Sequence, residues 1–203
     1  MTLPSPLLVI TDRRQARHSI EAIAEAMGQA GGRWLLFRDK DLEAAERRSF
    51  ASRLSAIARR HGMHLSVSRD TNLAAEFGAS VHLQSAAAVG PARQRIGREA
   101  IIGVSAHTLG DVKDAAAAGA DYVTLSPVFL TASKPGYGPA LGVDAITEAA
   151  KAGIAVVALG GITADAARPC LEAGAAGIAV MGEIMRSDDP RSSAIGLLAA
   201  LKS

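Results

Sequence analysis

The chain has 203 residues, a net charge of +2 and 21% charged residues, so it is long enough for one domain with a full hydrophobic core. Only 3% of its residues are aromatic and no basic stripe is present, so we expect no nucleic-acid partner. The single cysteine, Cys170, excludes an internal disulfide, and we expect it to be a packed thiol in a helix. The sequence shows no signal peptide and no apolar run of membrane-spanning length, so we expect a cytoplasmic protein.

Short apolar runs alternate with amphipathic segments along the whole chain. We expect strands at residues 7–11, 34–37, 65–67, 81–83, 101–104, 122–125, 156–159 and 178–181. Helices are expected between them, the first four at residues 19–27, 42–60, 72–77 and 91–96. Eight strands that alternate strictly with helices predict an α/β fold in which residues 1–203 form a single (β/α)₈ TIM barrel rather than an open sheet.

The only long connection between the expected elements spans residues 129–142 and is rich in Pro, Gly, Ser and Thr. Loops of this length are uncommon inside so short a chain and often have a function. We therefore expect a functional loop at this position, such as a lid.

Two strand–glycine–helix units near the C-terminus predict a phosphate site. Residues 156–162 read Val-Val-Ala-Leu-Gly-Gly-Ile, and residues 177–182 read Gly-Ile-Ala-Val-Met-Gly. Glycine at the end of a buried strand lets backbone N–H groups approach a ligand, and the following helix turns its N-terminus toward an anion. In a TIM barrel, such loops bind phosphate at the C-terminal ends of the strands.

Cationic and titratable side chains follow other strands. Arg38 and Lys40 are two residues apart after the second strand, so we expect both to point toward one anion, such as a diphosphate. His107 follows the fifth strand and is a candidate general acid or base; a structural histidine at the barrel rim is the alternative. We predict one pocket at this end of the barrel, lined by Arg38, Ser105, His107 and Gly161.

In these segments the chain resembles the thiamine phosphate synthase/TenI family nearly end to end. The matching motifs are Ile-Thr-Asp at 10–12, Phe-Arg-Asp-Lys at 37–40, Gly-Val-Ser-Ala-His at 103–107, Ala-Gly-Ala-Asp-Tyr-Val at 118–123, Thr-Ala-Ser-Lys at 131–134 and Gly-Gly-Ile-Thr at 160–163. A synthase of this family joins hydroxymethylpyrimidine diphosphate to thiazole phosphate, releases diphosphate and makes thiamine phosphate. The resemblance therefore implies a transferase of thiamine biosynthesis whose partners are small phosphorylated pyrimidine and thiazole metabolites.

The resemblance also implies roles for individual residues. Those that would bind the diphosphate of the pyrimidine substrate are Arg38, Lys40, Ser105 and Lys134. Those that would bind the thiazole phosphate are Thr131, Ser133, Gly161, Met181 and Gly182. The family's reaction passes through a pyrimidine carbocation, so Arg38 and Lys134 would be catalytic by stabilising the departing diphosphate.

The chain departs from the synthase pattern where that pattern binds Mg²⁺. Arg69 and Ala87 occupy the places of the two metal-binding aspartates, and Leu36 replaces the glutamine of the strand-two motif. Because a hard cation needs oxygen ligands, we expect no metal site and no tightly bound cofactor; Mg²⁺ would enter only with the diphosphate substrate. Arg69 could hold the diphosphate instead, and Asp70, one residue further, is expected to face away.

These observations leave three main functions open, besides another phosphate-using barrel enzyme. The first is a divergent synthase that depends less on metal, which the retained Arg38 and Lys40 favour and the missing carboxylates disfavour. The second is a thiazole tautomerase of the TenI type, which needs no metal and for which His107 would be the general acid or base. The third is a non-catalytic paralogue that binds a phosphate metabolite.

Overall fold

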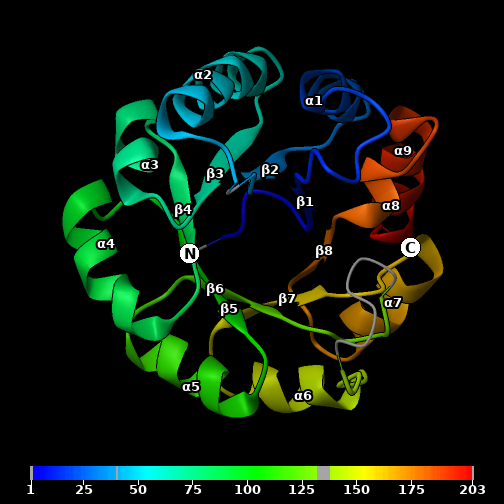
Figure 1. The fold of residues 1–203 in the computed structure, drawn as a ribbon. Helices are drawn as coiled ribbons and strands as arrows, with labels where there is room; N and C mark the ends of the chain where they lie inside the picture. The colour runs from blue at the N-terminus through cyan, green and yellow to red at the C-terminus, as the bar shows by residue number, and fades with distance from the viewer. Residues whose placement is uncertain (1, 40, 132–137, 203) are drawn as a thin grey trace.

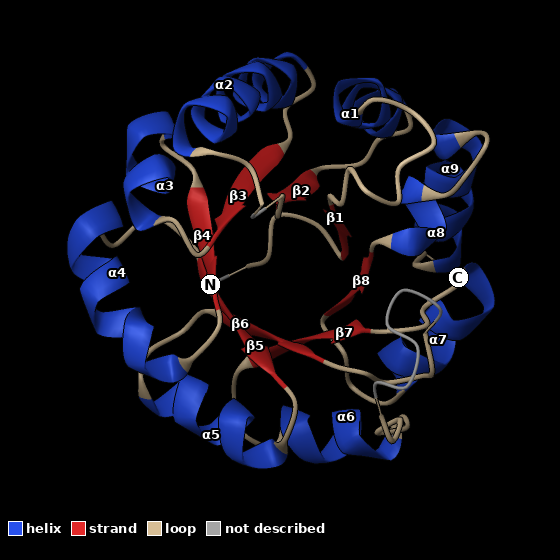
Figure 2. Ribbon diagram, in the orientation of Figure 1, coloured by secondary structure: helices blue, strands red, loops and turns tan. Residues whose placement is uncertain are grey.

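The structure of the protein is a computed structural model, which describes residues 2–39, 41–131 and 138–202. Eight parallel strands form a closed barrel in the order β1 to β8, and β8 pairs with β1 to close it. Figures 1 and 2 show the ring of strands at the centre and the helices around it. The predicted (β/α)₈ TIM barrel is confirmed.

The elements follow one another in strict alternation until the last two helices. The strands are β1 (Leu7–Ile10), β2 (Trp34–Phe37), β3 (His64–Ser68), β4 (Ser80–Leu83), β5 (Ile102–Ala106), β6 (Tyr122–Leu125), β7 (Ala155–Leu159) and β8 (Gly177–Val180). The helices are α1 (Ile20–Gln29), α2 (Ala44–Arg60), α3 (Thr71–Phe77), α4 (Val89–Ile96), α5 (Leu109–Ala117), α6 (Asp144–Ala150), α7 (Ala164–Glu172), α8 (Gly182–Met185) and α9 (Pro190–Ala200), with a 3₁₀ turn, η1 (Ala86–Ala88), before α4.

Each predicted strand is present; the second and the sixth have the predicted ends, and the ends of the others are shifted. The fifth was expected at residues 101–104, but β5 continues to Ala106 because Ser105 and Ala106 pair with Thr124 and Leu125 of β6. The second helix begins at Ala44 rather than at residue 42, since its N-cap residue Glu43 is still extended.

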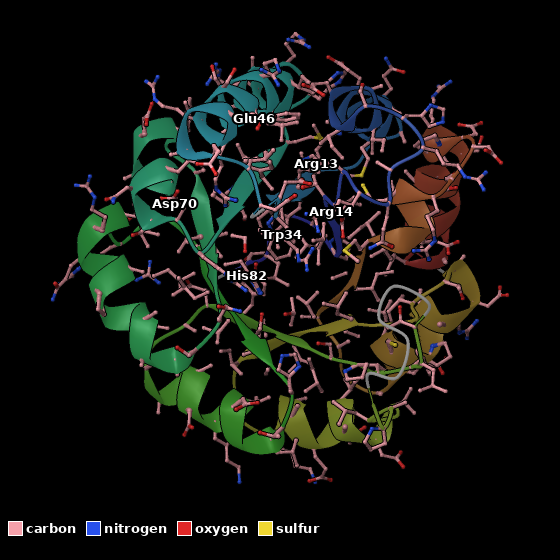
Figure 3. The ribbon with its side chains drawn as sticks, in the orientation of Figure 1. Arg13, Arg14, Trp34, Glu46, Asp70 and His82 are labelled. Atoms are coloured by element: carbon pink, nitrogen blue, oxygen red, sulfur yellow. The ribbon has the colours of Figure 1, made fainter. Side chains whose placement is uncertain are left out.

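Alternate residues of each strand face the helices and the barrel interior. The helix-facing residues join one large apolar core, whereas a smaller apolar cluster fills part of the interior. Trp34 and Tyr122 belong to this inner cluster, with ring centroids 4.9 Å apart. The interior also holds a buried polar group on β3 to β6, which includes His82 and Thr124 (Figure 3 labels Trp34 and His82 within the ring of strands). The barrel interior is therefore apolar on one side and polar on the other.

Two further expectations concern the chain as a whole. The side chain of Cys170 is buried in α7, and burial raises the pKa of its thiol to about 11, so the prediction of a packed thiol is confirmed. Among the described residues, no helix is both long and apolar enough to cross a membrane.

Candidate active site

Two adjoining pockets lie at the C-terminal ends of the strands, where one was predicted. The glycine pocket, of about 300 Å³, is formed mainly by the loops after β6, β7 and β8 and includes Gly161 and Gly182. The arginine pocket, of about 250 Å³, includes Arg38, Arg69 and His107. The residues lining both pockets are Ile10, Arg38, Ser126 and Leu159. The expected single pocket is thus divided, because these shared side chains lie at the boundary between its two halves.

The glycine pair after β7 brings the loop after β6 close to the pocket. Gly160 and Gly161 have φ angles of 99° and 64°, which favour glycine. A Cβ atom at Gly161 would lie 2.4 Å from the carbonyl oxygen of Leu130 and 2.8 Å from Cβ of Phe129. The backbone N–H of Phe129 also donates to the carbonyl of Gly160 at 3.0 Å. The glycines are therefore needed both for their own conformation and for the close approach of the neighbouring loop.

Arg186 is a pocket residue that the sequence reasoning missed. It lines the glycine pocket, and a Cβ atom at Gly182 would lie 2.3 Å from its Nη1, so the guanidinium lies against the Cα atom of Gly182. Nη1 of Arg186 donates to Oε1 of Gln15 at 2.5 Å, and Nε2 of Gln15 donates to Oδ2 of Asp12 at 2.9 Å. The spacing of four residues between Gly182 and Arg186, one helical turn, was the available signal.

A chain of side chains thus connects the cations of the two pockets. Nη1 of Arg38 lies 3.4 Å from Oδ2 of Asp12, which is the carboxylate oxygen that binds Gln15. The same Arg38 nitrogen is 3.9 Å from the sulfur of Met181. Arg38 is therefore fixed at the boundary of the pockets, with Arg186 at the other end of the network.

Polar groups from β4, β5 and β6 meet beneath the arginine pocket. Nδ1 of His82 lies 3.0 Å from the hydroxyl of Tyr122, and Nε2 lies 3.0 Å from Oγ of Ser105 and 3.3 Å from Oγ1 of Thr124. Burial lowers the pKa of His82 to about 4, so the ring is neutral near neutral pH. The predicted binding residue Ser105 is thereby held in place by a neutral histidine.

His107 extends from the end of β5 into the arginine pocket. Its Nδ1 is 2.8 Å from the carbonyl oxygen of Ser126, and its backbone N–H donates to Oδ2 of Asp111 at 2.9 Å. Thr108 and Asp111 form a capping box at the start of α5. Both the backbone and the ring of His107 are therefore held in one orientation.

The described residues at this end of the barrel do not offer the ligand set that a divalent cation needs. Within residues 2–39, 41–131 and 138–202, no three His, Cys, Asp or Glu side chains gather to hold a metal ion. Arg69 lines the pocket and Ala87 lies in η1, so neither expected carboxylate position offers an oxygen ligand. Asp70 accepts a hydrogen bond from the backbone of Leu73 at 2.9 Å and caps α3, where Figure 3 labels it. It does not line the pocket, but the strand alternation on which that expectation rested ends at Arg69, whose φ angle is 67°.

The structure brings the predicted residues together in two groups. Arg38, Ser105 and His107 line the arginine pocket. The glycine pocket is lined by Thr131, Gly161, Met181 and Gly182, and by Arg38 as well. The predicted residues Lys40, Ser133 and Lys134 lie outside the described residues, as does part of the expected lid.

Comparison with known proteins identifies the family. The sequence profile of the family described as "Thiamine monophosphate synthase" matches residues 7–184. The chain is 38% identical over 180 residues to a thiamine-phosphate synthase of Bacillus velezensis, which covers 85% of this chain and 80% of the relative. It is also 38% identical over 179 residues, or 87% of its length, to the thiamine biosynthesis bifunctional protein ThiM/ThiE of Symbiobacterium thermophilum, but spans only 37% of that longer protein.

A solved structure agrees with these matches. The thiamine phosphate pyrophosphorylase from Pyrococcus furiosus is similar with a TM-score of 0.83 and 28% identity, over 97% of this chain and 95% of that one. Profile, sequence and fold therefore point to the same group of proteins. The chain belongs to the thiamine monophosphate synthase family of thiamine biosynthesis.

Proposed function

We propose that the protein is a thiamine-phosphate synthase, a transferase that joins hydroxymethylpyrimidine diphosphate to a thiazole phosphate. The observation that carries the proposal is the pair of adjoining pockets, each lined by arginine side chains, with Arg38 at their boundary. A synthase must hold a phosphate and a diphosphate at once, with the two reacting atoms between them. The name of the Bacillus velezensis relative, a thiamine-phosphate synthase, favours this function over a tautomerase or a non-catalytic paralogue.

The glycine pocket supports binding of the thiazole phosphate. The backbone N–H groups around Gly161 and Gly182, together with the hydroxyl of Thr131, would donate hydrogen bonds to the phosphate oxygens. Arg186 would add a forked cation on the same side, since its guanidinium already lies against Gly182. Ser133 is expected to contribute a further hydroxyl. The bound thiazole would then extend toward Ile10 and Leu159 at the boundary with the arginine pocket.

The arginine pocket supports binding of the pyrimidine diphosphate. Arg38 would hold the diphosphate from the boundary, Ser105 would donate from the floor, and Lys40 and Lys134 are expected to add charge. In the reaction, the bond between the pyrimidine methylene carbon and the diphosphate oxygen breaks, and its electron pair leaves with the diphosphate. The thiazole nitrogen then forms a bond to the methylene carbon with its lone pair. Arg38 would lower the barrier by stabilising the negative charge that develops on the leaving group.

One assay tests the proposal directly. Purified protein is mixed with hydroxymethylpyrimidine diphosphate and thiazole phosphate, with and without Mg²⁺, and thiamine phosphate is measured by chromatography. We expect product, and we expect Arg38→Ala to lower kcat by roughly 10²–10³ because it removes a charge that stabilises the transition state. Arg98→Ala is the matched control, since Arg98 is exposed before β5 at the opposite end of the barrel. Absence of product under both conditions would refute the proposal.

A further inference from the structure

We infer that Arg69 takes the place of a divalent cation in this chain, and that its guanidinium and that of Arg38 bind the substrate diphosphate directly. The identity of the diphosphate as substrate rests on the proposed function. Direct binding of a pyrophosphate group without metal does not rest on the proposed function, so inorganic pyrophosphate can test it alone.

The backbone at Arg69 turns its side chain into the pocket. Ser68 belongs to the polar barrel interior, so the alternation of a strand would send the next side chain outward. Instead, Arg69 has a φ angle of 67° and is the one non-glycine residue with positive φ in the described part of the chain. As a result its side chain lines the arginine pocket.

This unfavourable conformation is held by its neighbours. The backbone N–H of Arg69 donates to the carbonyl of His82 on β4 at 2.8 Å, and that of Asp70 donates to the carbonyl of Ser68 at 2.9 Å. Asp70 then caps α3. Asn, Asp or Gly tolerates positive φ better than Arg does, so the local backbone alone gives no reason for an arginine. Residues kept in such conformations are concentrated at binding and catalytic sites.

The charges around Arg69 suit an anion and repel a metal ion. Among the described residues, the pocket lining contains the cations Arg38 and Arg69 and no Asp or Glu, and His82, which also lines it, is neutral near neutral pH. Arg69 is exposed, and its side chain makes no hydrogen bond or ion pair with the described residues. A guanidinium presents paired donors that match phosphate oxygens, whereas a positive charge in this place opposes the binding of a dication.

A buried arginine sets the relative position of the two pocket cations. Nη1 of Arg47 on α2 donates to the carbonyl of Asp39 at 2.6 Å, and Nη2 donates to the carbonyl of Ser68 at 2.8 Å. These carbonyls belong to the residues next to Arg38 and Arg69. The Arg47 guanidinium also lies 5.1 Å from the centroid of the Phe37 ring. Arg47 is therefore a positioning residue that holds the ends of β2 and β3 at a fixed separation.

The test is calorimetric titration of the full chain with inorganic pyrophosphate, in EDTA and in Mg²⁺. We expect the unaltered protein to bind pyrophosphate in EDTA, with no gain in affinity from Mg²⁺. Arg69→Asn should weaken binding by about tenfold to a hundredfold, the effect of losing a hydrogen bond from a charged group. Its Tm should be equal or higher, because Asn accepts positive φ more readily. Arg69→Lys, which keeps the charge but loses the fork, should bind with intermediate affinity.

Arg98, on the far side of the barrel from the pocket, provides the control for pyrophosphate binding. Arg98→Asn makes the same charge change at the opposite end of the barrel and should leave pyrophosphate binding unchanged. Binding that needs Mg²⁺, the absence of any binding, or an Arg69→Asn protein that binds as tightly as the unaltered one would overturn the inference. If Arg69→Asn fails to fold, Arg69→Lys is measured in its place. Pyrophosphate binding weaker than that of the unaltered protein would then support the inference, and equal binding would overturn it.

Failure of the inference and failure of the proposed function give different results. Formation of thiamine phosphate that requires Mg²⁺ and tolerates Arg69→Asn would overturn the role of Arg69 and leave the synthase function standing. Pyrophosphate binding in EDTA that depends on Arg69, with no thiamine phosphate formed, would sustain the inference and refute the function.

Discussion

Nδ1 of His107 lies 2.8 Å from the backbone carbonyl oxygen of Ser126. A carbonyl oxygen only accepts hydrogen bonds, so Nδ1 carries the proton, and Nε2 is the unprotonated nitrogen of the neutral ring. The backbone of His107 is held by Asp111 at the start of α5. This arrangement suits proton transfer by a fixed imidazole, as a tautomerase would require, and equally suits a structural part of a synthase pocket.

Substitution of His107 separates these two roles. In a synthase, we expect His107→Asn to lower thiamine phosphate formation less than Arg38→Ala, because departure of diphosphate needs charge rather than a base. In a tautomerase, the same change should lower thiazole phosphate isomerisation by roughly 10²–10⁴, with binding changed only a few-fold. Steady-state kinetics of product formation and NMR of the thiazole phosphate measure the two reactions. His18→Asn, at an exposed histidine, is the control.

Replacing Gly161 by alanine should lower the free energy of unfolding through two separate effects, backbone strain and a steric collision. Gly153 also has a positive φ, 72°, but a Cβ atom there would meet nothing within 4 Å, so Gly153→Ala measures backbone strain alone, roughly 1–2 kcal/mol. Gly161→Ala adds the collision with Leu130 and Phe129, and overpacking costs roughly 1–3 kcal/mol more. Urea unfolding of both variants gives the difference. Equal losses of stability would show that the loop after β6 moves aside freely.

The phosphate assignment of the glycine pocket depends on Arg186 and Gly182. We expect Arg186→Ala to weaken binding of thiazole phosphate about tenfold, or about 1.4 kcal/mol, and to leave binding of the dephosphorylated thiazole unchanged. Gly182→Leu should also weaken phosphate binding, since the new side chain displaces the Arg186 guanidinium. Arg168→Ala, which removes an exposed ion pair with Glu172 on α7, is the control. Equal affinity of the unaltered protein for both thiazoles in calorimetry would contradict the assignment.

The parts of the site that follow from regular geometry were predictable from the sequence. Arg38 continues the inward series of Trp34 and Leu36, and His107 continues that of Ser105, so the alternation of buried strands places their side chains at the barrel mouth. Eight apolar runs separated by amphipathic segments likewise predicted the closed barrel that the structure has.

The remaining parts depend on contacts that no local pattern contains. Arg69 reaches the pocket because a left-handed residue interrupts the alternation, and that conformation is stabilised from β4 and α3. Arg186 reaches it from the C-cap position of α8, a helix too short for a periodic signal. The division of the pocket depends on where Ile10 and Leu159, from opposite ends of the chain, lie in the closed barrel. The roles given to Lys40, Ser133 and Lys134 stay predictions.

The buried imidazole of His82 is expected to make the protein sensitive to mild acid. Burial lowers the pKa of this group from its ordinary value of 6.5 to about 4 in the folded protein. Between these values the unfolded chain binds a proton that the folded protein does not, so the free energy of unfolding falls as the pH falls. The loss between about pH 7 and pH 5 is about 2 kcal/mol. His64, whose pKa is also lowered by burial, changes stability in the same direction.

His82→Gln should remove most of this pH dependence, because glutamine can still bond to polar neighbours such as Ser105 but does not titrate. The carboxyl groups with lowered pKa values, such as Asp111, lose their stabilising effect only at lower pH, since their ordinary value is already 3.8. Urea unfolding at several pH values between about 7 and 5 therefore isolates the histidines. His18→Gln, at an exposed position, should retain the full decrease of the unaltered protein. If His82→Gln lost as much stability over this range as the unaltered protein, the titrating group would lie elsewhere.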